Sequence, residues 1–131
     1  MTVNKKKLIY ISHPSSGLEE NTRAIENIIR ILYSNDVLFD NYCFVSPVHC
    51  YGFMYNDVEY EKGIQFCLDL LDNCDGMLVF GDWKSSRGCN MEVKHCECND
   101  IPYLIIGNKD DLISRLSANL INDIHNIMIH R

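Results

Sequence analysis

The stretch 76-GMLVFG-81 decides how this chain folds. It is apolar without alternation, which is typical of a short strand buried on both faces of a parallel sheet. Three further runs of strand type lie elsewhere in the sequence: 7-KLIYIS-12, 37-VLFDNYCFVSP-47, which has a ragged start, and 102-PYLIIG-107. The sequence therefore predicts four strands.

Helical segments separate these strands. Residues 18–34, 58–73, 88–99 and 109–128 carry apolar side chains at helical spacing. Strands that alternate with amphipathic helices predict a parallel sheet covered on both faces, and right-handed crossovers favour the strand order 2-1-3-4. The predicted fold class is α/β, a three-layer flavodoxin- or Rossmann-like parallel sheet. We expect a single domain over residues 1–131.

Composition limits the function classes. The net charge of −6 argues against a broad basic face, so no nucleic acid polymer is expected as a partner. No apolar run approaches the ~20 residues that span a bilayer. The N-terminal MTVNKKK lacks the apolar core of a signal peptide, so we expect no membrane partner. Seven cysteines without a CxxC pair predict free thiols in a reducing, cytoplasmic compartment.

No metal or other cofactor is predicted. Cys89, His95, Cys96 and Cys98 crowd together, but zinc sites use paired ligands with matching pairs elsewhere in the chain. On a helix over residues 88–99, Cys98 would also point away from the face that Cys89 and Cys96 share.

The predicted strand order locates a ligand site. Ligands of open α/β sheets bind beyond the carboxyl ends of the strands, where the winding direction reverses. Here that point lies between strands 1 and 3, so the loops 12-SHPSSG-17 and 81-GDWKSSRG-88 should meet. Ser12, Ser15, Ser16 and Gly17 offer hydroxyl and N–H groups that suit an anion at a helix N-terminus. Simple helix capping explains them equally well.

Glu92 is the main candidate for chemistry. We expect it in the first turn of its helix, where the helix dipole favours the carboxylate, which could act as a nucleophile. Glutamate is also common in first turns without any function. Asp82 either accepts hydrogen bonds from sugar hydroxyls or caps a turn, and Trp83 either stacks on a base or covers its loop. His49, at the end of strand 2, either reaches the pocket or is structural.

Four segments together resemble the nucleoside 2-deoxyribosyltransferase-like superfamily, particularly its small phage and bacterial members. They are 8-LIYISHPSSG-17, 46-SP-47, 74-CDGMLVFG-81 and 86-SRGCNMEVKHC-96, in this order and spacing. The resemblance implies a flavodoxin-like fold, a nucleoside or nucleotide ligand, and a homo-oligomer with the site near the subunit interface.

The same resemblance implies roles for individual residues. Glu92 would attack C1′ of a deoxyribose while the base departs, and another base (transferase) or water (N-hydrolase) would then capture the sugar. Ser12, His13 and the loop through Gly17 would contact sugar or phosphate. Ser86 and Gly88 would form the turn on the phosphate side.

One position departs from the superfamily pattern. Its enzymes carry an Asp eight residues before the acid that opens strand 3, and counting back from Asp75 gives Cys67. This favours an alternative, a non-catalytic nucleotide-binding or nucleotide-sequestering protein on the same fold.

A second resemblance gives another alternative. The run Ile11-Ser12-His13 followed by serines, and a Glu three residues after Cys89, resemble TIR domains. Some TIR domains use a glutamate to cleave NAD at its glycosidic bond, so a TIR-like NAD glycohydrolase is the further alternative.

Overall fold

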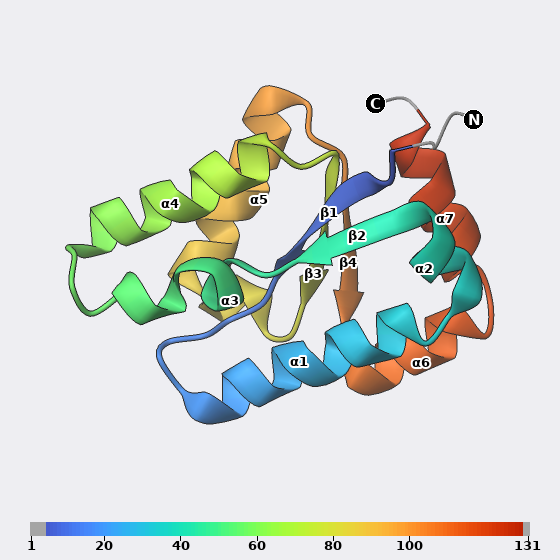
Figure 1. Cartoon of the computed structure of the whole chain (residues 1–131), viewed down its shortest axis with the longest axis horizontal. Coiled ribbons are helices and arrows are strands. Elements are labelled where there is room, and N and C mark those ends of the chain that lie inside the picture. The colour runs from blue at the N-terminus through green and yellow to red at the C-terminus, as the bar shows by residue number, and fades with distance from the viewer. Residues whose placement is uncertain (1–4, 130–131) are drawn as a thin grey trace.

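The computed structural model describes residues 5–129 of the chain. The first four residues of MTVNKKK, on which the prediction about a signal peptide partly rests, lie outside this described part. Four parallel strands form one sheet in the order β2-β1-β3-β4, as the sequence predicts (Figure 1). They are β1 (Lys7–Ser12), β2 (Tyr42–Val45), β3 (Gly76–Phe80) and β4 (Tyr103–Gly107).

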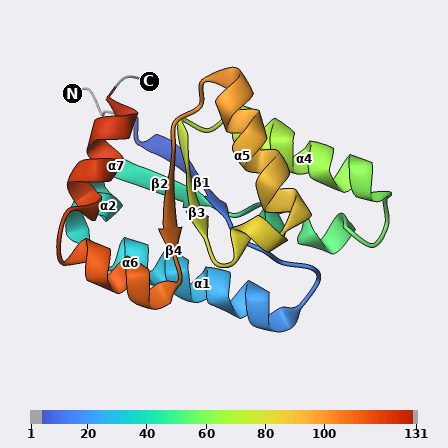
Figure 2. The same cartoon turned by 180° about the vertical axis from the view of Figure 1, so that it is seen from behind.

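Helices cover both faces of the sheet. The helices on one face are α1 (Glu19–Tyr33), α2 (Asp36–Asn41), α6 (Lys109–Leu116) and α7 (Leu120–Met128). The other face carries α4 (Tyr60–Asp72) and α5 (Arg87–Asn99) (Figure 2). Three short helices lie in connections: α3 (Pro47–Tyr51), η1 (Gly52–Met54) and η2 (Trp83–Ser85). The protein therefore has the three layers of a flavodoxin- or Rossmann-like fold.

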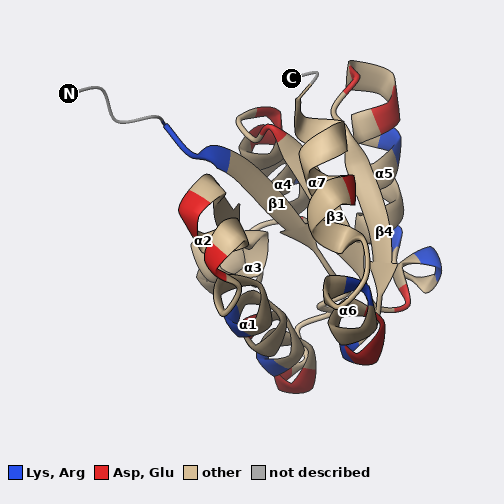
Figure 3. Ribbon diagram, turned by 90° about the vertical axis from the view of Figure 1, so that its right-hand side faces the viewer, with Lys and Arg blue, Asp and Glu red and all other residues tan. Residues whose placement is uncertain are grey.

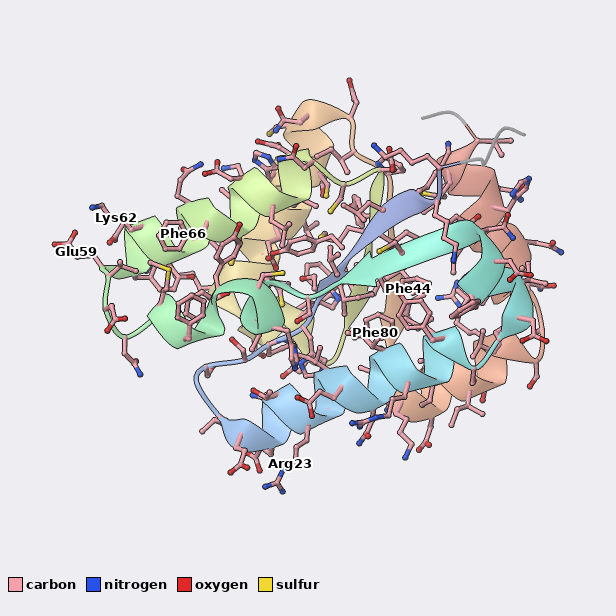
Figure 4. The ribbon with its side chains drawn as sticks, viewed as in Figure 1. Arg23, Phe44, Glu59, Lys62, Phe66 and Phe80 are labelled. Atoms are coloured by element: carbon pink, nitrogen blue, oxygen red, sulfur yellow. The ribbon has the colours of Figure 1, made fainter. Side chains whose placement is uncertain are left out.

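The apolar strands fill a core on each side of the sheet because successive side chains point to opposite faces. Leu78 and Phe80 of β3 pack towards α1 and α6, whereas Met77 and Val79 pack towards α4 and α5. All four side chains are fully buried. Figure 4 shows Phe44 and Phe80 in the layer between the sheet and α1.

Asp75 fixes the start of β3 against β1, at the end of the sheet opposite to the predicted site. Its N–H donates to the carbonyl of Leu8 (2.7 Å), and its Oδ2 accepts from the N–H of Leu8 (2.8 Å). These two hydrogen bonds give Asp75 a structural role at this end of the sheet.

The second predicted strand was too long. Residues 36–41 form α2 instead, and β2 begins only at Tyr42. The Asn35 side chain caps α2 by accepting the N–H of Leu38 (3.1 Å), and Leu38 is buried in the core. A cap and one buried apolar residue therefore suffice for a short helix where the polar-apolar mixture suggests a ragged strand.

The helix predicted over residues 109–128 is two helices. The break spans residues 117–119, where the N–H of Ala118 donates to the carbonyl of Arg115 (3.1 Å) and tightens the last turn of α6. Arg115 then pairs with Asp123 across the break (3.2 Å). The turn sends α7 along the sheet with Leu120, Ile124 and Met128 buried.

Charged side chains of both signs are mixed on the surface. Along α1 and α6, acidic and basic positions follow one another (Figure 3). Within residues 5–129, none of the helices combines the length and the apolar character that a membrane span requires.

The junction of β4 and α6 gives a prediction about stability. Gly107 has a φ of 113°, and a Cβ there would overlap the Asp111 carboxylate, which accepts the N–H of Asn108 (2.9 Å). We expect Gly107→Ala to lower the free energy of unfolding in urea by about 2–3 kcal/mol, through backbone strain and loss of this cap. The control Gly63→Ala lies inside α4, with its nearest neighbour 3.8 Å from the new Cβ, and should stabilise by up to about 1 kcal/mol. Equal effects of the two substitutions would contradict this account.

Candidate active site

The loops after β1 and β3 meet, as the strand order predicts. Gly81 has a φ of 73°, and a Cβ at this position would lie 3.1 Å from Cδ of Pro14 and 3.2 Å from Nε2 of His13. Glycine both adopts this backbone conformation and leaves room for the neighbouring loop. The contact brings residues 12–17 and 81–88 together at the carboxyl ends of the central strands.

A cavity of about 340 Å³ lies between these loops, α3, the segment after η1 and the N-terminal parts of α4 and α5. This volume falls in the usual range of small-molecule sites. Seven of the predicted site residues line it: His13, Ser15, Ser16, Gly17, Ser86, Gly88 and Glu92.

Glu92 lines the cavity with a carboxyl group that is almost wholly withdrawn from solvent; the residue is 5% exposed. The Ser12 hydroxyl donates to Oε1 (2.7 Å), and the Tyr10 hydroxyl donates to Oε2. Both donors come from β1 and are themselves fully buried. They hold the carboxyl group in one orientation, while each of its oxygens keeps a lone pair for a further contact.

Burial sets the protonation of Glu92. It raises the pKa of the carboxyl group to about 7, against the opposing effect of the hydrogen bonds from Tyr10 and Ser12. A carboxyl group with such a pKa gains or loses a proton near neutral pH, which suits acid–base chemistry or a nucleophile that is ionised on demand.

The prediction that Glu92 lies in the first turn of its helix is wrong. The Ser86 hydroxyl accepts the N–H of Cys89 (3.2 Å), so α5 begins at Arg87 and Glu92 falls in the second turn. The dipole acts mainly within the first turn, so it favours the carboxylate less than the sequence suggests. Desolvation has the larger effect on the pKa of Glu92, and it favours the protonated form.

Four other predicted residues do not line the cavity. Ser12 lies behind the cavity wall, where its hydroxyl donates to the Glu92 carboxyl group. His49 bridges Ser46 Oγ (2.9 Å) and Glu26 Oε2 (2.8 Å), which ties α3 to α1. Asp82 is exposed at the end of its strand, and Trp83 is half-buried against the apolar cluster under α4 and α5. These placements correspond to the structural interpretations of His49 and Trp83.

Several residues that form the site carry no functional signal in the sequence. Tyr55, Tyr60 and Arg87 line the cavity, and the Arg87 guanidinium carbon lies 4.3 Å from the centre of the Tyr60 ring. Tyr10 could have been found, since it is two residues from Ser12 on one strand and therefore shares its face. Tyr55 and Tyr60 lie in a stretch to which no chemistry was assigned.

Cys67 faces the cavity from α4. Its Sγ lies 3.2 Å from the Tyr55 hydroxyl. Burial raises the pKa of this thiol and that of Tyr55, so both groups stay neutral.

The cysteine and histidine cluster of α5 is dispersed by the fold. Cys96 is buried in the core, Cys98 is exposed, and His95 Nε2 pairs with Asp72 Oδ1 (2.5 Å). Over residues 5–129, no group of three or more His, Cys, Asp or Glu side chains is arranged to hold a metal ion.

Comparison with known families identifies the family of this chain. A family model described as a domain of unknown function, DUF7768, matches residues 7–106, and the chain therefore belongs to this family. The match runs from the first residue of β1 into β4 and includes every residue that lines the cavity. No curated protein matches the sequence.

The burial of Glu92 predicts a stability that depends on pH. Between about pH 4.5 and 7 the folded protein keeps a proton on Glu92 that the unfolded chain releases, so the free energy of unfolding falls as pH rises through this window. The amide side chain in the Glu92→Gln variant does not titrate, so the variant lacks this contribution to the pH dependence. Its stability relative to wild type should therefore increase by about 3 kcal/mol from pH 4.5 to pH 7, in urea titrations at several pH values.

The matched control for this measurement is Glu97→Gln, an exposed glutamate of the same helix. It should follow the wild-type pH profile. Parallel profiles for wild type and Glu92→Gln would show that burial does not control the Glu92 proton.

Proposed function

We propose that this member of the DUF7768 family binds a nucleoside or nucleotide in the cavity and cleaves its N-glycosidic bond, with Glu92 as the nucleophile. The observation that carries the proposal is the buried Glu92 carboxyl group, which lines the cavity between the two loops and is oriented by Tyr10 and Ser12. The resemblance to the nucleoside 2-deoxyribosyltransferase-like superfamily supports the same role.

The reaction explains why such a group is useful. Cleavage of an N-glycosidic bond develops positive charge on the sugar ring, and a carboxylate close to C1′ stabilises that charge covalently or electrostatically. Because Glu92 is almost wholly withdrawn from solvent, this interaction is stronger than it would be in water. The hydroxyls of Tyr10 and Ser12 keep the reacting oxygen in place without neutralising it.

The start of α5 offers the better position for a 5′-phosphate. Its first turn carries no acidic residue and begins with Arg87 beside Ser86 and Gly88. The first turn of α1, by contrast, carries Glu19 and Glu20, which would repel an anion. We therefore assign the phosphate to the 86–88 turn, and the sugar to the loop of residues 12–17 with His13 and Ser15.

The proposed assembly is a homo-oligomer with the site near the subunit interface. Three large apolar or aromatic side chains are exposed on segments that surround the cavity: Leu18 (50%), Phe53 (78%) and Tyr60 (44%). A second copy packed there would cover these side chains. Light scattering of the purified protein measures its oligomeric state directly.

The free state of all seven cysteines fits the proposed cytoplasmic location.

Cys67 favours one alternative, a protein on this scaffold that binds nucleotides without turning them over. Its neutral thiol is a poor proton donor for a departing base. The two functions differ in whether free base is released.

The test is incubation with deoxynucleosides, their 5′-monophosphates and NAD, followed by chromatography for free base. We expect base release by the wild-type protein and a loss of roughly a hundredfold or more in rate for Glu92→Ala and Glu92→Gln. The control Glu97→Gln should keep the wild-type rate.

Two results would overturn the catalytic role of Glu92. Undiminished release by Glu92→Ala would remove it from the chemistry. No release from any substrate, together with a melting temperature raised by the same compounds, would establish the binding protein instead.

A further inference from the structure

Glu92 is a buried acid that the fold leaves without a cationic partner. The ion pairs within residues 5–129 join Arg23 to Glu19, His49 to Glu26, His95 to Asp72 and Arg115 to Asp123. Glu92 has only the uncharged hydroxyls of Tyr10 and Ser12. Buried carboxylates normally have a cation beside them, so the cavity has a place for positive charge next to Glu92.

The neighbouring walls suit a cation as well. Tyr55, in the turn after η1, and Tyr60, at the start of α4, line the cavity, and the Tyr60 ring already holds the Arg87 guanidinium over one face. Tyrosine rings attract cations through their negative faces. Arg87 itself would be neutralised by a 5′-phosphate at the start of α5, so it does not oppose a positive group beside Glu92.

The same walls are poor proton donors. Besides Glu92 and the Arg87 guanidinium, the titratable groups that line the cavity are the His13 imidazole, the Tyr55 and Tyr60 phenols and the Cys67 and Cys89 thiols. Burial raises the pKa of the phenols and thiols, and it lowers the pKa of His13, which leaves less of the proton-donating imidazolium at neutral pH. A neutral nucleoside releases its base as an anion unless an acid protonates it, and these groups protonate it weakly.

We propose that the ligands of this cavity are cationic N-glycosides, in which the nitrogen bonded to C1′ belongs to a positively charged ring, as in pyridinium ribosides and 7-alkylated purine nucleosides. The proposal rests on the proposed function, since it names the substrate class of the same site. The positive ring supplies the charge that Glu92 lacks, and binding it favours the ionised carboxylate.

The chemical step balances without a proton donor. A Glu92 carboxylate oxygen forms a bond to C1′, and the C1′–N bond breaks with both electrons moving to nitrogen, so that the base leaves neutral. Water then attacks C1′, the carboxylate leaves, and one proton passes to solvent. Hydrolysis of each cationic glycoside therefore yields one free sugar, one neutral base and one proton.

The decisive experiment compares pairs of similar shape and different charge. The substrate pairs are nicotinamide riboside with its neutral dihydro form, and 7-methylguanosine with guanosine, each with and without a 5′-phosphate. We expect kcat/KM for the cation to exceed that for its neutral counterpart by about a hundredfold, with one proton released per base. The two pairs distinguish a pyridinium from a purine ligand.

A binding measurement separates this proposal from the catalytic one. The probes are 1-methylnicotinamide, a cation without a glycosidic bond, and neutral nicotinamide. Wild type should bind the cation about tenfold more tightly, and Glu92→Gln should lose this preference while Glu97→Gln keeps it. Far-UV circular dichroism confirms that both variants are folded.

Each outcome decides one of the two proposals. Equal affinity for the two probes, or neutral nucleosides cleaved as fast as cationic ones, overturns the cationic ligand class and leaves the glycosidase in place. Tighter binding of the cation without cleavage of any glycoside supports the cation site and overturns catalysis.

A gain of activity gives an independent check. Cys67→Asp places a carboxylic acid on the same wall and should raise kcat/KM for the neutral nucleosides by about tenfold or more, whereas Cys67→Asn should not. An equal change in both variants would show that proton donation does not limit cleavage of neutral substrates.

Discussion

The pair of hydrogen bonds from β1 to the carboxyl group of Glu92 is the interaction on which the site depends. Tyr10 and Glu92 are 82 residues apart in the sequence, yet their side chains meet in a fully buried contact. Burying a carboxyl group without partners costs several kcal/mol, and the two hydroxyls offset part of this cost. They also join α5 to β1, a central strand, so the orientation of the carboxyl group is set by two fully buried side chains of the sheet.

The position of this contact follows from the topology of the sheet. The chain leaves β1 towards one side and β3 towards the other, which opens a crevice at their carboxyl ends. The close approach at Gly81 brings the two loops together, and α3 with the segment after η1 closes the cavity on a third side. The site is therefore a consequence of strand order, with glycine and serine supplying room and polar groups at the crevice.

Within residues 5–129, no ion pair includes the buried carboxyl group of Glu92. The phenols and thiols that line the cavity with it stay neutral because burial raises their pKa. A single carboxyl group in such surroundings responds strongly to any charge that a ligand brings, because the low local polarity leaves the interaction largely unscreened. Ligand binding and ionisation of Glu92 are in this way coupled.

The sequence by itself determined the four strands, their order and the meeting of the two loops, because the repeats of apolar residues report burial locally. It did not reveal the helix over residues 36–41, the break between α6 and α7, or the second-turn position of Glu92, since each depends on a cap or a single side-chain contact. Only the tertiary structure decided that Tyr55, Tyr60 and Cys67 line the cavity and that Tyr10 contacts Glu92. Their proximity arises from packing between elements far apart in the chain, and no local pattern encodes the distance between two such side chains.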